Sequence, residues 1–149
     1  MAMRHRLGIT EKSGNLFAPA IALALTIGRL GCLLGGCCYG VPTGLPWGVD
    51  FGDGITRHPT QLYESVFALA LCVFLLAVRR RFNEPGRLFG IFMLAYFSFR
   101  FLIEFLRAGD VTAIGLTAAQ LASLGILAYY LQREYRITKT DRRLTNETR

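Results

Sequence analysis

Residues 88–106, LFGIFMLAYFSFRFLIEFL, decide the fold class of this chain. The run is long and apolar enough to cross a bilayer as one helix, which needs about 20 residues. Two charged residues, Arg100 and Glu104, interrupt it. Because a charge near the membrane centre costs about 3 kcal/mol on insertion scales, a charged pair in such a helix indicates a functional site.

The rest of the chain repeats this pattern. Apolar residues make up 52% of the sequence, and the mean hydropathy is +0.37. We therefore expect an all-α, polytopic membrane protein with a Gly/Pro-rich loop between its first two helices. Residues 1–12 are polar and basic, and the first apolar run starts only at Leu16 and lacks a small-residue cleavage pattern after it, so we expect no cleaved leader. The predicted single domain, residues 1–149, has helices at residues 16–36, 59–78, 88–106 and 111–131.

The positive charge predicts the orientation in the membrane. Of the 17 Lys and Arg residues, thirteen lie in residues 1–12, 79–87 and 132–149. Basic residues in short loops stay on the cytoplasmic side. Four spans place all three segments there, so both termini are predicted to be cytoplasmic. Residues 132–149 are predicted to form a solvated, partly disordered basic tail near anionic lipid. The expected partner is the bilayer, with no nucleic acid.

Four basic residues lie outside these cytoplasmic segments. A helix rises about 1.5 Å per residue, so Arg29 and Arg100 are predicted about 18–20 Å from the cytoplasmic face. Glu64 enters the membrane from the opposite side and approaches the same depth. Three helices therefore bring ionisable groups to one layer of the outer leaflet. The four residues are Arg29, Arg57, Arg100 and Arg107.

Tyr96, Arg100, Glu104 and Arg107 share one face of the third predicted helix, because they follow a spacing of i, i+4, i+8 and i+11. This face should point to protein or water. Alternatively, Arg100 and Glu104 only neutralise each other while Arg107 reaches the interface. Arg29 disfavours that alternative, because it lies on a separate helix without an acidic neighbour in sequence.

Glycines surround Arg29. Gly31/Gly35 and Gly36/Gly40 have GxxxG spacing, which permits close approach of another helix or of a ligand. Helix packing alone would explain them. The presence of Arg29 favours a pocket for an anion, since guanidinium binds phosphate through a bidentate fork. At this depth the expected anion is a phospholipid head group.

His58 precedes Pro59 at the start of the second predicted helix. Proline suits the first turn of a helix, so we expect His58 at the cap, with Gln61 reaching back to it. The alternative role for His58 is an acid or base at the membrane surface, where an imidazole pKa suits proton transfer.

Five sequence blocks together resemble the prolipoprotein diacylglyceryl transferase family. They occur in family order from about residue 17 to residue 131. The blocks are Gly28-Arg29-Leu30-Gly31 with Gly36 and Gly40, Leu45-Pro46-Trp47, His58-Pro59-x-Gln61-Leu62-Tyr63-Glu64, Phe99-Arg100-Phe101-x-x-Glu104-Phe105-x-Arg107, and Gly115-Leu116-Thr117-x-x-Gln120.

The resemblance implies a multi-pass enzyme of the bacterial inner membrane with its site toward the periplasm. Such an enzyme moves diacylglycerol from phosphatidylglycerol to the lipobox cysteine of a prolipoprotein signal peptide and releases glycerol phosphate. The reaction needs a thiolate, hence a base, and a stabilised phosphate leaving group. No cofactor is expected. The alternative is a non-catalytic phospholipid-binding protein or a truncated relative that keeps the head-group pocket.

The resemblance also implies the site residues. Arg29 and Arg100 are expected to hold the phosphate, Glu104 to fix Arg100, and Arg107 to steer the head group. The implied catalytic residues are Tyr96, Arg100 and His58. The implied substrate-binding residues are Arg29, Gly31, Cys32, Gly36, Gly40, Gln61, Tyr63, Glu64, Glu104 and Arg107.

The sequence departs from the family pattern in two ways. The family has further N-terminal helices with a His-Gly motif, and this chain begins after them. Cys32 aligns with the usual asparagine, and Cys37 with the usual glutamate. With Cys38 and Cys72 these cysteines suggest a disulfide or a soft-metal site. However, the spacing matches no standard zinc pattern, so packing is the expected role of Cys72 and no metal ligand is assigned.

Overall fold

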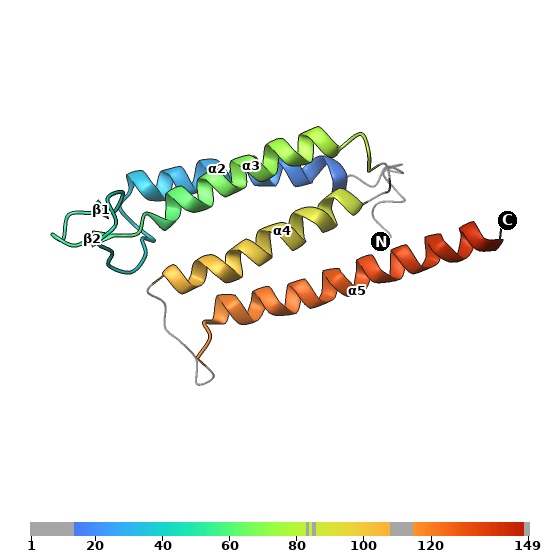
Figure 1. Ribbon diagram of the computed structural model, residues 1–149. Coiled ribbons are helices and arrows are strands. Elements are labelled where there is room, and N and C mark those ends of the chain that lie inside the picture. Colours follow the sequence, from blue (N-terminus) through green and yellow to red (C-terminus); the bar gives the residue numbers. More distant parts are fainter. Residues whose placement is uncertain (1–13, 83, 85, 108–114, 148–149) are drawn as a thin grey trace, which may run out of the picture.

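The computed structural model describes residues 14–82, 84, 86–107 and 115–147, with side chains through residue 139. Its long helices run alternately up and down, and a short hairpin lies at one end of them (Figure 1). The elements are α2 (Gly14–Leu34), β1 (Val49–Asp50), β2 (Thr56–Arg57), α3 (Thr60–Val78), α4 (Arg87–Ile103), the 3-10 helix η1 (Glu104–Leu106) and α5 (Ala118–Glu147).

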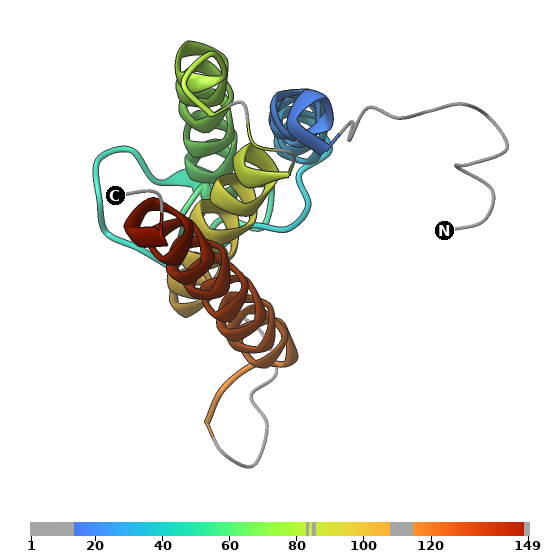
Figure 2. The same cartoon turned by 90° about the vertical axis from the view of Figure 1, so that its right-hand side faces the viewer.

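Three segments of the described chain are long and apolar enough to cross a membrane: α2, α3, and α4 continued by η1. This confirms the all-α, polytopic class. The fourth predicted span starts in residues 111–114, which lie outside the described part, as do the basic residues 1–12. Viewed end-on, α4 lies between the α2–α3 pair and α5 (Figure 2).

Small residues on α2 allow α3 to pack closely against it. Ala18, Ala22 and Thr26 recur every four residues and are buried. Two α3 side chains then reach backbone oxygens of α2: Ser65 donates to Thr26 at 3.3 Å and Cys72 donates to Pro19 at 3.3 Å. Small interfacial residues and such hydrogen bonds are typical of helix contacts in membranes.

Asn15 holds the α3–α4 connection at the base of α2. Its amide nitrogen donates to the carbonyl of Glu84 at 2.8 Å, and its oxygen accepts from the backbone N–H groups of Gly86 and Leu88 at 3.0 and 3.1 Å. It thereby caps α4, whose own N-cap residue has no side chain. Nothing in the local sequence predicts this role of Asn15, since its partners are about 70 positions away.

The α2 helix ends at Leu34, two residues earlier than predicted, in a Schellman motif. The Cys37 N–H donates to the Cys32 carbonyl at 3.1 Å, and the Gly36 N–H donates to the Leu33 carbonyl at 3.2 Å. Gly36 has a φ of +61°, a left-handed conformation that glycine adopts readily. Gly36 and Gly40 therefore lie beyond the helix, and their spacing does not serve helix packing.

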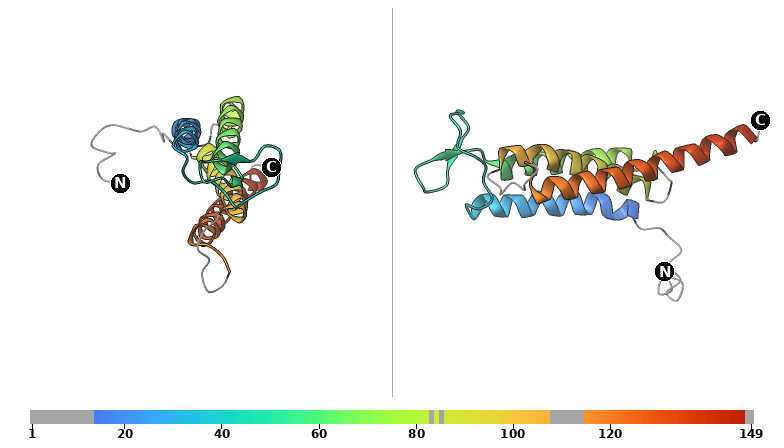
Figure 3. Two further views of the ribbon diagram at one scale, coloured as in Figure 1. Left: turned by 90° about the vertical axis from the view of Figure 1, so that its left-hand side faces the viewer. Right: turned by 90° about the horizontal axis from the view of Figure 1, so that it is seen from below.

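The α5 helix differs from the prediction at both ends. It begins at Ala118, because Thr117 and Gln120 form a capping box: the Thr117 hydroxyl accepts from the Gln120 backbone N–H at 3.2 Å, and the side-chain oxygen of Gln120, Oε1, accepts from the Thr117 backbone N–H at 2.9 Å. At the other end α5 continues to Glu147 and extends beyond the other helices (Figure 3). The prediction of a partly disordered tail from residue 132 is wrong up to residue 147, since neither Gly nor Pro interrupts the helix.

The Gly/Pro-rich loop between α2 and α3 is an ordered hairpin. Asp50 accepts from the backbone N–H groups of Gly52 and Gly54, and Asp53 accepts from Ile55 at 3.1 Å. Arg57 binds Asp53 through Nη2 at 2.6 Å and lies over the ring of Tyr39. The hydrogen bond from Arg57, followed by that from the Ile55 N–H, lowers the pKa of the Asp53 carboxyl.

We predict that the hairpin loosens in acid. A carboxyl with a lowered pKa in the folded state contributes stability above its unfolded pKa of about 3.9, and this contribution is lost as the pH falls through the folded value. Hydrogen exchange of the Ile55 amide should therefore accelerate below about pH 4. The control is Asp53→Asn, which lacks the charge, so its exchange rate should not show this additional acceleration. Equal pH profiles in both proteins would contradict this.

Candidate functional site

Five ionisable side chains from three segments form one chain of ion pairs. Arg29 on α2 contacts Glu64 on α3 (Nε to Oε2, 2.6 Å), and Arg107 contacts the other oxygen of Glu64 at 3.4 Å. Arg107 Nε also lies 3.9 Å from Oε2 of Glu104, which pairs with Arg100 at 2.7 Å. The expected pairing of Arg100 with Glu104 is thus confirmed, and the two carboxylates connect all three arginines.

This network is largely removed from solvent. Glu64 is 4% exposed and Glu104 is 8% exposed. Three guanidinium and two carboxylate groups leave one excess positive charge. Several atoms, including Oε2 of both carboxylates and Nη1 of Arg100, are in close ionic contact without the alignment of a hydrogen bond. The carboxylate oxygens can only accept hydrogen bonds, so an anion would be held by the guanidinium N–H groups and by the excess positive charge.

Arg107 reaches the network from extended backbone, so the prediction that it shares a helical face with Tyr96 is wrong. The α4 helix ends at Ile103, η1 follows, and Arg107 has φ −101° and ψ 141°. It forms an isolated β-bridge with Gly40. Tyr96 remains on α4, where its side chain interacts with Arg29 and stacks on Phe92.

Gly40 lies where the loop after α2 meets the end of η1. Its N–H donates to the His58 carbonyl at 2.9 Å, and the next N–H, of Val41, donates to the Leu106 carbonyl at 2.9 Å. A Cβ atom on Gly40 would clash with that Leu106 oxygen and lie 2.8 Å from a Thr60 methyl group. Close packing of two backbones thus requires glycine here.

The start of α3 holds the loop through side-chain to backbone hydrogen bonds. The Thr60 hydroxyl donates to the Cys38 carbonyl at 2.9 Å, and the Gln61 amide donates to the Cys37 carbonyl at 2.5 Å. The prediction that Gln61 reaches back to a capping His58 is therefore wrong: Pro59 is the N-cap, without a side-chain cap bond. The Gln61 amide binds the loop carbonyl of Cys37 instead. Gln61 Oε1 is buried without a hydrogen-bond partner.

His58 belongs to a polar group beside the hairpin. Its Nδ1 lies 3.3 Å from the hydroxyl of Tyr63, and Trp47 Nε1 donates to that hydroxyl at 2.8 Å. Gly31, in contrast, faces open space, with nothing near a Cβ built on it. Gly36 likewise has nothing within 4 Å of a Cβ built on it. The structure therefore gives no reason, at Gly31 or Gly36, for a role in the ion network.

Thr117 is a further residue in contact with the network. Its hydroxyl donates to Glu104 at 3.1 Å while it caps α5. The spacing Thr-x-x-Gln is a recognisable capping box and could have predicted the start of α5. Its contact with Glu104 depends on the tertiary structure.

A groove of about 410 Å³ runs along one face of α2 to the network. Its residues have helical spacing and are apolar up to the last turn, where a guanidinium and a thiol follow. The lining residues are Ile21, Ala24, Leu25, Gly28, Arg29 and Cys32. This is the size range of small-molecule pockets, with a polar group at one end.

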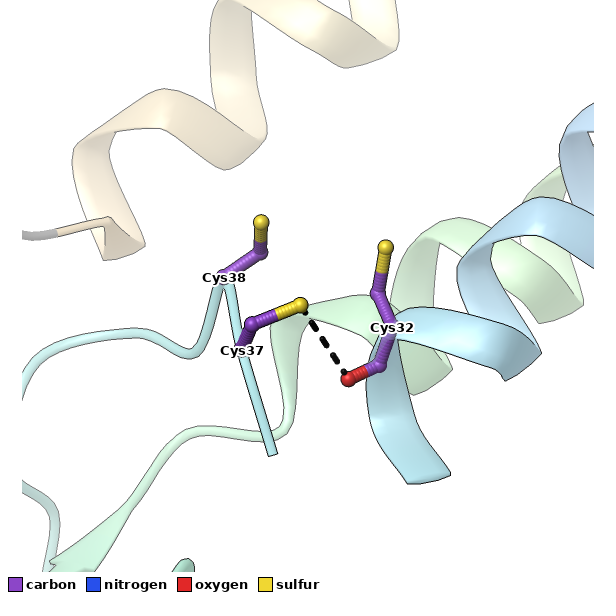
Figure 4. A group of neighbouring side chains, drawn as sticks. All are labelled: Cys32, Cys37 and Cys38. Atoms are coloured by element: carbon purple, nitrogen blue, oxygen red, sulfur yellow. Dashed lines mark hydrogen bonds between the residues drawn. The ribbon is translucent and has the colours of Figure 1, made fainter. Parts of the chain in front are cut away.

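Three of the four cysteines converge at the end of α2 (Figure 4). The sulfur atoms of Cys32, Cys37 and Cys38 all lie within 4.8 Å of one another. Hydrogen bonds with the other two thiols raise the pKa of Cys37. Cys72 lies apart in the α2–α3 core, which agrees with the packing role expected for it.

Comparison with known proteins matches residues 3–132 to one family, described as prolipoprotein diacylglyceryl transferase. The chain belongs to this family. It is 40% identical over 133 residues to a phosphatidylglycerol–prolipoprotein diacylglyceryl transferase of Clostridium tetani, covering 80% of this chain and 53% of that protein. It is 41% identical over 118 residues to the protein of the same name from Geobacter sulfurreducens, covering 77% and 45%.

The chain thus spans about half the length of these diacylglyceryl transferases. Every residue of the ion network lies in the part that matches the family. The family resemblance inferred from the five sequence blocks is confirmed.

Proposed function

We propose that this chain binds phosphatidylglycerol and transfers its diacylglyceryl group to the lipobox cysteine of prolipoproteins. The observation that carries the proposal is the network of three arginines around two buried glutamates, with one excess positive charge. One phosphodiester, with a single negative charge, neutralises this excess. The names of the relatives supply the reaction.

In this proposal the arginines stabilise the leaving group. Sulfur attacks the glycerol carbon, the carbon–oxygen bond breaks, and the oxygen leaves on glycerol phosphate with an added negative charge. Preorganised donors stabilise charge that develops in a transition state. Arg29 and Arg100 bind the phosphate, Arg107 steers the head group, and Glu64 and Glu104 fix the guanidinium groups. Tyr96 donates a hydrogen bond beside Arg29.

The groove on α2 supports a lipid substrate. Its apolar residues lead to Arg29, so an acyl chain in the groove would bring the phosphate to the network. Among the described residues, His58 is the only imidazole. We assign it the role of an acid or base at the membrane surface, oriented by Tyr63. Gln61, which is fully buried, positions the loop that carries Cys37.

We also propose the topology of a four-span protein of the bacterial inner membrane. The α3–α4 connection and the far end of α5 lie at one end of the structure, and both are basic (Figure 1). The positive-inside rule assigns that end, with both termini, to the cytoplasm. The ion network and the hairpin lie toward the opposite end, which faces the periplasm.

The decisive experiment is transfer of labelled diacylglycerol from phosphatidylglycerol to a lipobox peptide by the purified chain in lipid nanodiscs. A peptide with serine in place of the lipobox cysteine is the control. Labelled cysteine peptide supports the enzyme. Phosphatidylglycerol binding without transfer would instead support the second candidate, a non-catalytic lipid-binding protein, which the same network favours.

We predict that Arg29→Lys weakens binding of phosphatidylglycerol by about tenfold or more. Lysine can still pair with Glu64, but it lacks the planar fork, and each charge-assisted hydrogen bond contributes about 1.5–3 kcal/mol. The measurement is lipid binding in neutral nanodiscs doped with phosphatidylglycerol. Arg57→Lys, in the hairpin and paired with Asp53, is the matched control and should bind normally. Unchanged binding by Arg29→Lys would exclude Arg29 as a phosphate ligand.

A further inference from the structure

The way α2 ends brings two cysteines together. In a Schellman motif the residues called C3 and C″ contact each other, and here these are Cys32 and Cys37. The Cys37 thiol lies 3.6 Å from the Cys32 carbonyl oxygen. A stable backbone motif therefore fixes the separation of the first two thiols.

A left-handed residue adds the third thiol. Cys38 has a φ of +63°, uncommon for a residue with a Cβ atom. The Cys38 and Cys37 carbonyls are held by Thr60 and Gln61 on α3, so this conformation is stabilised by the tertiary structure. Figure 4 shows the sulfurs of Cys32 and Cys38 on one side of the chain, with that of Cys37 directed toward Cys32.

We propose that Cys32, Cys37 and Cys38 form a three-sulfur site for a thiophilic cation, Zn²⁺, whose open fourth position takes the thiol of the acceptor peptide. Zinc–sulfur bonds of about 2.3 Å place three thiolates about 4 Å apart around the metal. The sulfurs here lie within 4.8 Å of one another, so the site closes with a shift of about 1 Å. Three protein ligands with an open position are typical of catalytic zinc.

The site lies beside the proposed phosphate ligands. Cys32 and Arg29 are one turn apart on α2, and both line the groove. A thiol bound here would be near a phospholipid whose phosphate contacts Arg29. Cys37 and Cys38 are exposed, so an incoming thiol has access.

The chemical role of this zinc site rests on the proposed function, the transfer of a diacylglyceryl group to a thiol. A thiol that coordinates Zn²⁺ loses its proton, which passes to solvent. The zinc-bound sulfur then attacks the glycerol carbon, and the electron pair of the broken carbon–oxygen bond leaves on glycerol phosphate. The thioether product binds zinc more weakly than the thiolate and dissociates. The cation thus supplies the thiolate that the reaction needs.

The test begins with metal binding to the whole chain, purified with reductant in nanodiscs. We expect one Zn²⁺ per chain by elemental analysis, and with Co²⁺ a thiolate-to-cobalt charge-transfer band. Mutation of a residue that only hydrogen-bonds to a metal ligand typically lowers metal affinity about 10–100-fold. Loss of a ligand itself, in Cys32→Ser, Cys37→Ser or Cys38→Ser, should therefore weaken zinc binding by about 100-fold or more. Cys72→Ser, in the buried core, is the matched control and should bind normally.

Two results would overturn the site. One is the absence of stoichiometric metal in the reduced protein. This result counts against the site also when two of the thiols are found as a disulfide before reduction. The other is metal binding that persists in the triple serine variant. The helical circular-dichroism signal and the thermal unfolding midpoint of that variant, compared with those of Cys72→Ser, show that it is folded; if it is not, the triple alanine variant takes its place.

The acceptor thiol is tested separately. Adding the lipobox peptide to the Co²⁺ form should strengthen the charge-transfer band, while the serine peptide should leave it unchanged. An equal response to both peptides would contradict binding of the acceptor thiol at the open zinc position. Diacylglyceryl transfer that continues after the metal is removed would contradict it too. The proposed function would survive either result. Metal binding and a cysteine-dependent response without any transfer would support the site and contradict the proposed function.

Discussion

Glu64→Gln should be among the most destabilising single substitutions in this chain. Glu64 pairs with Arg29 at 2.6 Å and with Arg107 at 3.4 Å, and it is 4% exposed. Glutamine keeps the shape but removes the charge. Two guanidinium groups then lose a shared counter-ion, and breaking a buried ion pair from one side costs about 3–5 kcal/mol.

The measurement is the free energy of unfolding in mixed micelles. The matched control is Glu84→Gln. Glu84 also pairs with an arginine, Arg87, at 2.7 Å, but its side chain is 49% exposed. Exposed pairs contribute about 0–1 kcal/mol, so the control should unfold almost like the unchanged protein. If both variants lose equally little stability, Glu64 is not the centre of the network.

Gly40→Ala should detach the loop after α2 from the end of η1. The added methyl group meets the Leu106 carbonyl, a Thr60 methyl at 2.8 Å and the His58 Cβ at 2.9 Å. Overpacking typically costs about 1–3 kcal/mol, and the obstacle here is partly backbone, which has little freedom to move. We expect a loss of about 3 kcal/mol and release of Arg107, which is bridged to Gly40.

Hydrogen exchange at Val41 reports this detachment directly, because its amide donates to the Leu106 carbonyl. It should accelerate strongly in Gly40→Ala. Gly44→Ala provides the control in the same loop, since nothing lies within 4 Å of its Cβ position. Protection of Val41 that is equal in both variants would show that the loop tolerates the methyl group.

Glu64 illustrates how far the sequence could predict the network. Its depth followed from the helical rise, and the Arg100–Glu104 pair followed from i, i+4 spacing. The pairing of Arg29 and Arg107 with Glu64 did not, because it joins residues 35 and 43 positions apart. Arg29 has no acidic neighbour in sequence, and its partner Glu64 lies on another helix.

For the cysteines, too, the sequence could predict only part of the site. Their number and order suggested a disulfide or a soft-metal site, but the spacing alone favoured neither. The Schellman motif and the left-handed Cys38 bring three sulfurs together. A Gly-rich helix end predicts such a motif in general. The conformation of Cys38 depends on Thr60 and Gln61, which belong to another helix.

By itself the sequence determined the membrane class, the course of α3 and the motifs of the family. Hydropathy and helical spacing are properties of neighbouring residues, so they can be read along the chain. Only the tertiary structure decided which carboxylate holds which arginine, why Gly40 is required, and where α2 and α5 end. Those features arise from contacts between segments distant in sequence, and packing of the helices determines which of the possible contacts form.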